Sequence, residues 1–132
     1  KAFDTVSHDH IIKGLQQRQV DSHIIHLIQN MYDNTITRIT TRKEKSDPIK
    51  ILKGVKQGDP MSPLLFNLAL DPLLCRLEKK GKGFHQGDHM ITAMAFADDL
   101  VLLSDSWEGM KKNIKILEKF CDLTGLKTQG EK

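Results

Sequence analysis

Apolar residues recur three or four positions apart in several parts of the chain, which is the spacing of one face of a helix. A first helical stretch begins over 10–13 and is weakened by Gly14. A second helix is predicted to start at a cap formed by Asp21 or Ser22 and to end at Asn34. Its apolar side is expected to consist of Ile24, Ile25, Leu27, Ile28 and Met31.

Two longer helices are predicted further along the chain. Ser62 and Pro63 are expected to begin the first of them, as its N-cap and first helical residue. Pro72 lies inside its pattern and should kink it, because proline cannot donate a backbone hydrogen bond. The second is an amphipathic helix that stops near Gly125. The expected apolar faces are Leu64, Leu65, Leu68, Leu73, Leu74 and Leu77 in the first helix, and Trp107, Met110, Ile114, Leu117 and Cys121 in the second.

The segments between the helices have the pattern of strands. Residues 35–42 and 48–53 are expected to form a hairpin closed by the polar residues between them. Residues 89–96 and 100–103 are apolar runs suited to buried strands. The order helix, hairpin, helix, hairpin, helix predicts an α+β fold in which helices cover one face of an antiparallel sheet.

Composition and length fit one globular domain. The chain has 132 residues, of which 39% are hydrophobic and 28% charged. It contains no apolar run near the roughly 18 residues that a membrane span needs, so we expect no membrane association. Lys1 is not followed by the pattern of a signal peptide, and the chain is expected to be part of a longer protein.

The basic residues are unevenly distributed. The net charge is only +3, yet seven basic residues lie between Arg38 and Lys56 against two acidic ones, Glu44 and Asp47. A stretch of this kind can lie along a phosphate backbone, or it can be the solvated surface of a hairpin. Charge alone does not decide between these two interpretations.

The cysteines and histidines do not indicate a metal site or a disulfide framework. Cys75 and Cys121 lie in apolar helical patterns, which favours a reducing, intracellular setting. Cys75 with His85, or His23 with His26, would need a second pair of ligands to complete a zinc site. We therefore expect no zinc.

Asp98 and Asp99 stand at the tip of a predicted hairpin with apolar arms. Two carboxylates about 4 Å apart repel each other by about 4 kcal/mol at an effective dielectric constant of about 20. A Mg²⁺ ion would compensate this repulsion, because it prefers carboxylate oxygens and leaves positions open for phosphates. The alternative is a solvated turn whose two side chains face water.

The segment 54–63 is a loop rich in glycine and proline that leads into a helix. Gly58 would let a backbone or a base approach closely, and the start of the helix would favour an anion. Lys56 adds a positive charge there, and Gln57 adds an amide that can donate and accept. The alternative is an ordinary connection between a strand and a helix.

Three segments, in this order along the chain, resemble motifs of the reverse transcriptase palm. They are Lys1-Ala2-Phe3-Asp4, the run Gln57-Gly58-Asp59-Pro60-Met61-Ser62-Pro63-Leu64-Leu65-Phe66-Asn67, and Phe96-Ala97-Asp98-Asp99. The chain is most similar to enzymes of non-LTR (LINE-type) retrotransposons, within them to the clade that inserts into ribosomal RNA genes. The resemblance covers nearly the whole chain, and it implies that residues 1–132 are a partial palm domain with an antiparallel sheet packed on helices.

The resemblance implies RNA-templated synthesis of DNA. In this family the primer 3′-hydroxyl attacks a deoxynucleoside triphosphate with the help of two Mg²⁺ ions. The implied partners are an RNA template, a DNA primer and the nucleotide, and the implied location is the nucleus. Asp98 and Asp99 would be catalytic and hold metal. The implied substrate-binding residues are Phe3 as a steric gate against ribose, Gln57 and Gly58 in the nucleotide pocket, and Lys132 beside the departing pyrophosphate.

The sequence departs from the family pattern at both ends. The family's first metal-binding aspartate precedes the gate by five residues, so with the gate at Phe3 it would precede Lys1; Asp4 is not its equivalent. The strand that carries this aspartate, the fingers and the thumb would belong to a longer parent polyprotein. Thr128 and Gln129 stand where the family has an apolar residue and Asn, which weakens the assignment of Lys132. The 132 residues alone are therefore expected to be inactive as a polymerase.

Three other functions remain open at this stage. The chain could be a non-catalytic retrotransposon remnant that binds only RNA or a partner protein. It could be a metal-dependent nuclease based on Asp98 and Asp99, although Asp105 and Glu108, the nearest further acids, belong to the start of a helix. It could also be a structural domain without a ligand.

Overall fold

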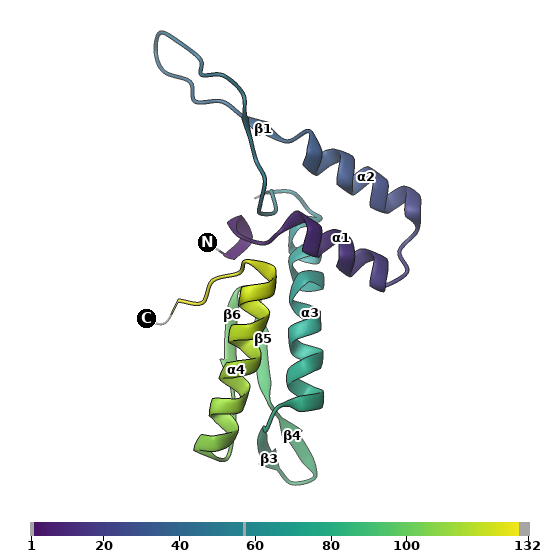
Figure 1. The fold of residues 1–132 in the computed structure, drawn as a ribbon, viewed down its shortest axis with the longest axis vertical. Coiled ribbons are helices and arrows are strands. Elements are labelled where there is room, and N and C mark those ends of the chain that lie inside the picture. The colour runs from purple at the N-terminus through teal and green to yellow at the C-terminus, as the bar shows by residue number, and fades with distance from the viewer. Residues whose placement is uncertain (1, 57, 130–132) are drawn as a thin grey trace.

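The computed structural model describes residues 2–56 and 58–129, which fold into helices and short hairpins. Their order is η1 (Ala2–Asp4), α1 (His8–Gln17), α2 (Ser22–Asp33), β1 (Ile36–Thr37), β2 (Ile49–Lys50), α3 (Ser62–Lys80), β3 (Phe84–Gln86), β4 (His89–Ile91), β5 (Ala93–Phe96), β6 (Asp99–Leu102) and α4 (Trp107–Thr124) (Figure 1). The expected α+β class is confirmed. The strands of this part of the chain form three separate antiparallel pairs, β1–β2, β3–β4 and β5–β6, instead of one sheet.

The main core lies where α1, α2 and the first half of α3 meet. Asp21 caps α2 as expected, because its carboxylate accepts a hydrogen bond of 2.8 Å from the backbone N–H of His23. Gly14 is buried at the contact of α1 with α3, where an added Cβ would lie 3.4 Å from Leu68. The buried apolar residues of this core are Val6, Ile11, Leu15, Ile25, Ile28, Val55, Leu65, Phe66, Ala69 and Leu126.

Helix α3 begins one residue away from its expected cap. Met61 is the N-cap, and the Ser62 hydroxyl instead donates to the backbone carbonyl of Lys56 at 2.5 Å. The helix continues through Pro72 to Lys80. Its buried face differs from the predicted one at Leu64, which is exposed.

The β1–β2 hairpin was predicted in the right place, but its regular strands are much shorter than expected. It projects from the helices (Figure 1), and both of its strands are exposed on both faces. A two-stranded ribbon without a covering layer is only marginally stable, which explains why its regular ladder is limited to two pairs of residues. An isolated bridge between Thr40 and Lys45 continues it toward the tip.

The prediction of one buried strand over 89–96 was wrong. The segment is divided at Thr92 into β4, which pairs back with β3, and β5, which pairs with β6. The unexpected strand β3 follows from a tight turn at Gly87, which has a φ of +60°. Nor is the segment buried, since Phe96 is 85% exposed.

The β5–β6 hairpin packs against α3 and α4 with one face only. Leu100 and Leu102 of β6 are half-buried, whereas Met94, Phe96 and Val101 on the other face are exposed. Helix α4 also buries a different side from the predicted apolar one. Trp107 is 68% exposed, and the buried positions of the helix are Gly109, Asn113 and Thr124.

Candidate functional site

Asp98 and Asp99 lie at the tip of the β5–β6 hairpin, as predicted. Phe96 pairs with Asp99, so the turn consists of Ala97 and Asp98, and Ala97 has a positive φ of +51°. Both aspartates are exposed. Exposure to water and salt reduces the repulsion between two carboxylates well below its value beside a dry sheet.

The alternation of side chains along a strand determines on which face of the β5–β6 hairpin Asp99 lies. Cross-strand partners lie on the same face, so Asp99 lies with the exposed Phe96, next to the Met94–Val101 pair. The opposite face carries Leu100 and packs on the helices. The acidic tip therefore adjoins an open apolar face.

The hairpin tip points toward the middle of the molecule, where α3 begins beside α1 (Figure 1). Thr92 contacts the region of Gly81, at the far end of α3. The seven residues from Thr92 to Asp98 span six steps, or about 20 Å, while the 19 residues of α3 rise about 28 Å. The tip therefore lies nearer to the start of α3 than to its end.

Phe3 is joined directly to the glycine-rich loop. Its backbone carbonyl accepts a hydrogen bond of 2.7 Å from Val55 N–H, and Gly54 N–H donates to Val6 at 2.8 Å. The Phe3 ring stacks on the buried ring of Phe66, with a centroid distance of 4.4 Å and an interplanar angle of 14°. These contacts bring the predicted gate and the segment before Gly58 together, although they lie far apart in the sequence.

Gly58 occupies an open position in the loop. Its φ is +85°, and an added Cβ would meet no atom within 4 Å. Asp59 stabilises the start of α3, because its carboxylate accepts a hydrogen bond of 2.9 Å from Met61 N–H. The predicted site residues Gln57 and Lys132 lie outside the described residues.

A cavity of about 440 Å³ lies beside this loop, and the sequence pattern did not indicate it. Lys56, Asp59 and Ser62 line it from the loop and the start of α3, while Met31 and Tyr32 line it from α2. Burial, with a smaller contribution from Asp59, raises the pKa of Tyr32 to about 12. The cavity is mostly apolar with a few polar groups, which is the usual character of a small-ligand site.

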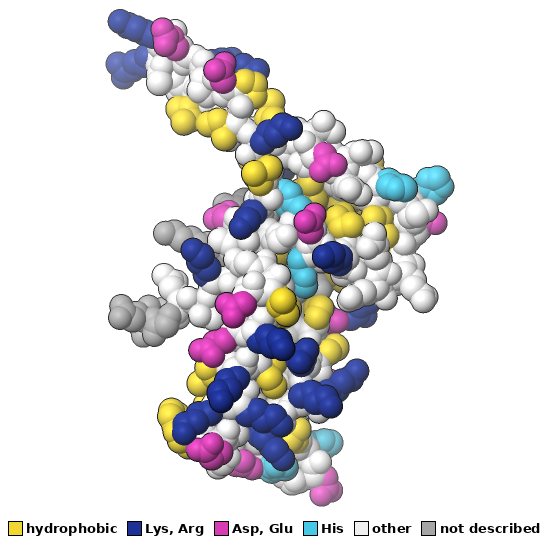
Figure 2. Space-filling view, in the orientation of Figure 1, with side chains coloured by type: hydrophobic (Ala, Val, Ile, Leu, Met, Phe, Trp, Pro, Cys, Tyr) yellow, Lys and Arg dark blue, Asp and Glu magenta, His cyan; other side chains and the backbone are white. Residues whose placement is uncertain are grey.

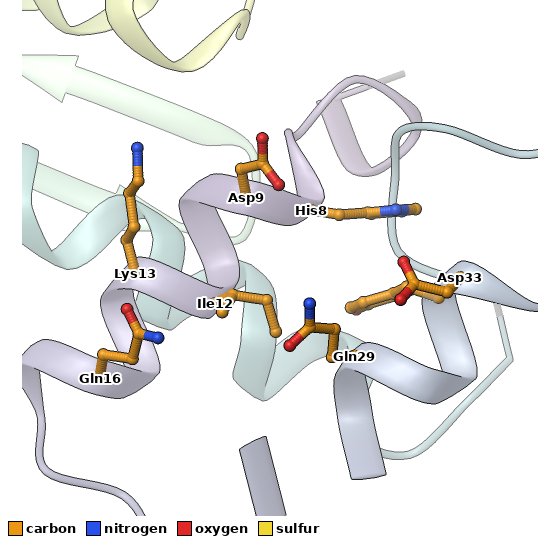
Figure 3. Close-up of a pocket in the computed structure, with 8 residues that line it drawn as sticks. His8, Asp9, Ile12, Lys13, Gln16, Gln29 and Asp33 are labelled. Carbon is orange, nitrogen blue, oxygen red and sulfur yellow. The ribbon is translucent and has the colours of Figure 1, made fainter. Parts of the chain in front are cut away.

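His8 links α1 to the loop and to α2. Its Nε2 donates to the carbonyl of Gly54 at 2.8 Å, and its ring stacks on Tyr32 with a centroid distance of 4.1 Å. Figure 3 shows His8 and Asp33 beside a second cavity of about 220 Å³ between α1 and α2. Nothing in the spacing of these residues along the chain would have predicted this contact.

The acidic tip fits part of a magnesium site. Mg²⁺ is commonly held by one or two carboxylates, with its remaining positions taken by water and substrate phosphates. Asp98 in the turn and Asp99 at the start of β6 offer two such groups in consecutive residues. No cluster of three or more His, Cys, Asp or Glu residues suited to a metal ion occurs within 2–56 and 58–129.

None of the helices in the described part of the chain has the length and apolar character to cross a membrane.

Comparison with known proteins gives one consistent result. Residues 1–132 match the family model described as "Reverse transcriptase (RNA-dependent DNA polymerase)". The "Retrovirus-related Pol polyprotein from type-1 retrotransposable element R2" of Nasonia vitripennis is 40% identical over 130 residues, which cover 98% of this chain and 12% of that protein. The protein of the same description from Popillia japonica is 40% identical over 134 residues, covering 100% of this chain and 19% of its own length.

A third relative comes from Drosophila melanogaster. It is the "Retrovirus-related Pol polyprotein from type-2 retrotransposable element R2DM", 36% identical over 132 residues that cover 100% of this chain and 12% of that protein. The chain thus spans between about an eighth and a fifth of the length of these three relatives.

Proposed function

Since the chain belongs to the reverse transcriptase (RNA-dependent DNA polymerase) family, we propose that it is part of the palm of an RNA-directed DNA polymerase. The resemblance to non-LTR retrotransposon enzymes is confirmed by the relatives. The family match over residues 1–132 is the observation that carries the proposal. The proposed partners are an RNA template and a DNA primer, with the fingers and thumb of a longer polyprotein.

The proposed reaction joins a deoxynucleotide to the 3′-hydroxyl of the primer. Asp98 and Asp99 would hold Mg²⁺ through their exposed carboxylates. When bound, two such ions lower the pKa of the hydroxyl and neutralise charge on the pyrophosphate that leaves. One carboxylate lies in the turn and the other on the first residue of β6, and the β5–β6 ladder fixes both backbone positions, so placing the two groups costs little free energy when a metal binds.

The remaining site residues would orient the nucleotide and the template. Phe3 would exclude a ribose 2′-hydroxyl, and its stacking on Phe66 would prevent the ring from moving aside when a ribonucleotide enters. Gly58 leaves the loop surface free of a side chain, which suits close approach of a base pair. Gln57 would line the nucleotide pocket. Lys132 would lie beside the departing pyrophosphate.

We propose that the 132 residues alone do not polymerise DNA. The reaction needs carboxylates that position two metals, and the described residues offer Asp98 and Asp99 without a third nearby ligand. A polypeptide that supplies the further aspartate and the surfaces that hold the primer would be active.

Primer extension on an RNA template tests both statements. The isolated chain should incorporate no nucleotide, and a longer polyprotein that contains it should do so. In that longer protein Asp98→Asn and Asp99→Asn should each lower incorporation by at least about 100-fold, as is typical when a group that stabilises the transition state is removed.

Asp88→Asn is the matched control, because Asp88 is also an exposed aspartate in a hairpin turn. It should leave incorporation unchanged. Template-dependent synthesis by the isolated chain would refute the proposed inactivity. Equal activity of Asp98→Asn and Asp88→Asn would refute the metal-binding role, and a longer polyprotein that binds RNA without any incorporation would identify a non-catalytic remnant.

A further inference from the structure

A second charged surface lies away from the acidic tip, on the outer side of α3 and α4. We call it the α3–α4 basic face and define it as Arg76, Lys79, Lys80, Lys82, Lys111, Lys112, Lys115 and Lys119. All eight residues are exposed. Figure 2 shows lysine and arginine side chains gathered over these two helices, with acidic side chains at the margins.

The basic face is held together by a buried side chain. Asn113 of α4 is fully buried, and its amide donates to the carbonyl of Lys82 at 2.9 Å while its oxygen accepts from Lys82 N–H at 2.9 Å. The same amide donates to the carbonyl of Leu103 at 3.2 Å. The connection after α3 is therefore fixed on α4, and lysines from two separate segments form one surface.

Few internal partners neutralise these charges. Segments 76–82 and 107–124 contain eight Lys and Arg residues against four Asp and Glu residues. Among the eight basic side chains, Lys111 forms an ion pair with Glu108 at 3.1 Å, and no other ion pair of the face occurs in the part of the chain that the structure describes. The surface thus offers an excess of positive charge to a partner.

Trp107 stands at the edge of the basic face with most of its ring in water. It is 68% exposed, and Nζ of Lys111 lies 5.6 Å from the ring centroid. An exposed aromatic ring at the edge of a lysine-rich surface is a combination that binds single-stranded nucleic acid, because bases stack on the ring while the charges contact phosphates. Lysine is depleted in the cores of protein–protein interfaces, so a protein partner fits this surface less well.

We propose that the α3–α4 basic face binds single-stranded RNA, at a surface separate from the polymerase site. The choice of RNA over DNA rests on the proposed function. The RNA template of a polymerase extends beyond the segment that is paired with the primer at the polymerase site, so an unpaired part of the RNA is available to a second surface. Recognition is by charge and stacking, so it is independent of sequence and of Mg²⁺.

Trp107 provides a local signal for the test because it is the single tryptophan of the chain. The 132-residue chain is titrated with fluorescein-labelled oligouridine of about 15 nucleotides, a length near the upper site size of small single-strand binders, in EDTA at about 0.1 M salt. Fluorescence anisotropy measures binding, and a parallel titration with unlabelled oligouridine measures quenching of Trp107. Both titrations should give the same midpoint.

The combined variant Lys112→Gln, Lys115→Gln and Lys119→Gln should weaken binding at least tenfold, since glutamine keeps the helix propensity and removes three charges. The slope of the logarithm of the binding constant against the logarithm of the salt concentration should become shallower by about 2. The matched control, Lys13→Gln with Arg18→Gln and Lys127→Gln, removes the same charge from three exposed residues outside both this face and the basic 38–56 segment. It should change affinity less than threefold.

Several results would overturn the proposal. These are the absence of binding, equal losses in the two triple variants, and binding without quenching of Trp107, which would place the strand elsewhere. Displacement of the RNA by polyglutamate of equal charge would identify a surface for an acidic protein, and a tenfold preference for a DNA strand would exclude RNA. Asp98→Asn should leave binding unchanged, so a failed polymerase assay and a failed binding assay remain distinguishable.

Discussion

The amide of Asn113 forms a reciprocal pair of hydrogen bonds with the backbone of Lys82, a residue 31 positions earlier in the chain. This contact joins the end of α3 to the middle of α4. It also explains why a polar residue occupies the most buried position of α4, since a buried amide is tolerated only when its donors and acceptor are satisfied.

The first prediction concerns this contact. Asn113→Ala removes three hydrogen bonds and leaves the backbone groups of Lys82 and Leu103 without partners, so the free energy of unfolding should fall by about 2–4 kcal/mol. Urea unfolding followed by circular dichroism measures the loss. Asn67→Ala, at an exposed position of α3, should change stability by less than about 0.5 kcal/mol. Similar losses in both variants would show that the contact contributes nothing.

The second prediction concerns Gly54, which holds the glycine-rich loop against η1. Its φ is +91°, and an added Cβ would lie 2.8 Å from Cα of Asp4. Gly54→Ala should therefore lower the free energy of unfolding by more than the roughly 1 kcal/mol that the left-handed backbone alone costs, because the backbone of η1 must also move. Gly87→Ala is the control, since Gly87 has a φ of +60° and open space around it. Equal losses would mean that the contact with Asp4 is unimportant.

The third prediction concerns the ionisation of Tyr32, the single tyrosine of the chain. Burial, followed by Asp59, raises its pKa to about 12 from the usual 10.0. The near-ultraviolet absorbance of tyrosinate should therefore rise near pH 12 in the folded protein and near pH 10 in urea. Asp59→Asn should lower the folded midpoint only slightly, because burial is the larger cause. A folded midpoint near 10 would show that the ring is solvated.

The same shift has a consequence for stability. The unfolded chain releases the phenol proton at a lower pH than the folded chain, so the contribution of Tyr32 is complete below about pH 10 and is lost as the pH rises to about 12. Tyr32→Phe should remove this part of the alkaline loss. Parallel curves of unfolding free energy against pH for both proteins would contradict the linkage.

The fourth prediction concerns Phe3, whose half-buried ring stacks on Phe66. Phe3→Ala should cost about 1–3 kcal/mol of unfolding free energy, less than truncation of a fully buried phenylalanine. Phe3→Leu should cost less, because it keeps most of the apolar contact. Phe96→Ala removes a ring that is 85% exposed and should have almost no effect. If Phe3→Ala were equally neutral, the stack would not stabilise the fold.

Local chemistry explains what could be predicted from the sequence. The cap at Asp21, the end of α4 at Gly125 and the hairpin that presents Asp98 all depend on residues close together in the chain. The family of the chain was also recognisable, because its motifs are short runs of residues whose order does not depend on packing.

Tertiary structure decided the features that depend on distant partners. The amphipathic pattern predicted Trp107 on the inner side of α4, but the close approach of Gly109 to Lys82 and the bonds of Asn113 turn the helix so that the tryptophan is exposed. The strand expected over 89–96 was divided because Thr92 marks a change of pairing partner. The contact of Phe3 with Val55 and the stack of His8 on Tyr32 join residues far apart in sequence. No local pattern encodes such pairs, because their energy comes from surfaces that meet only when the whole chain has folded.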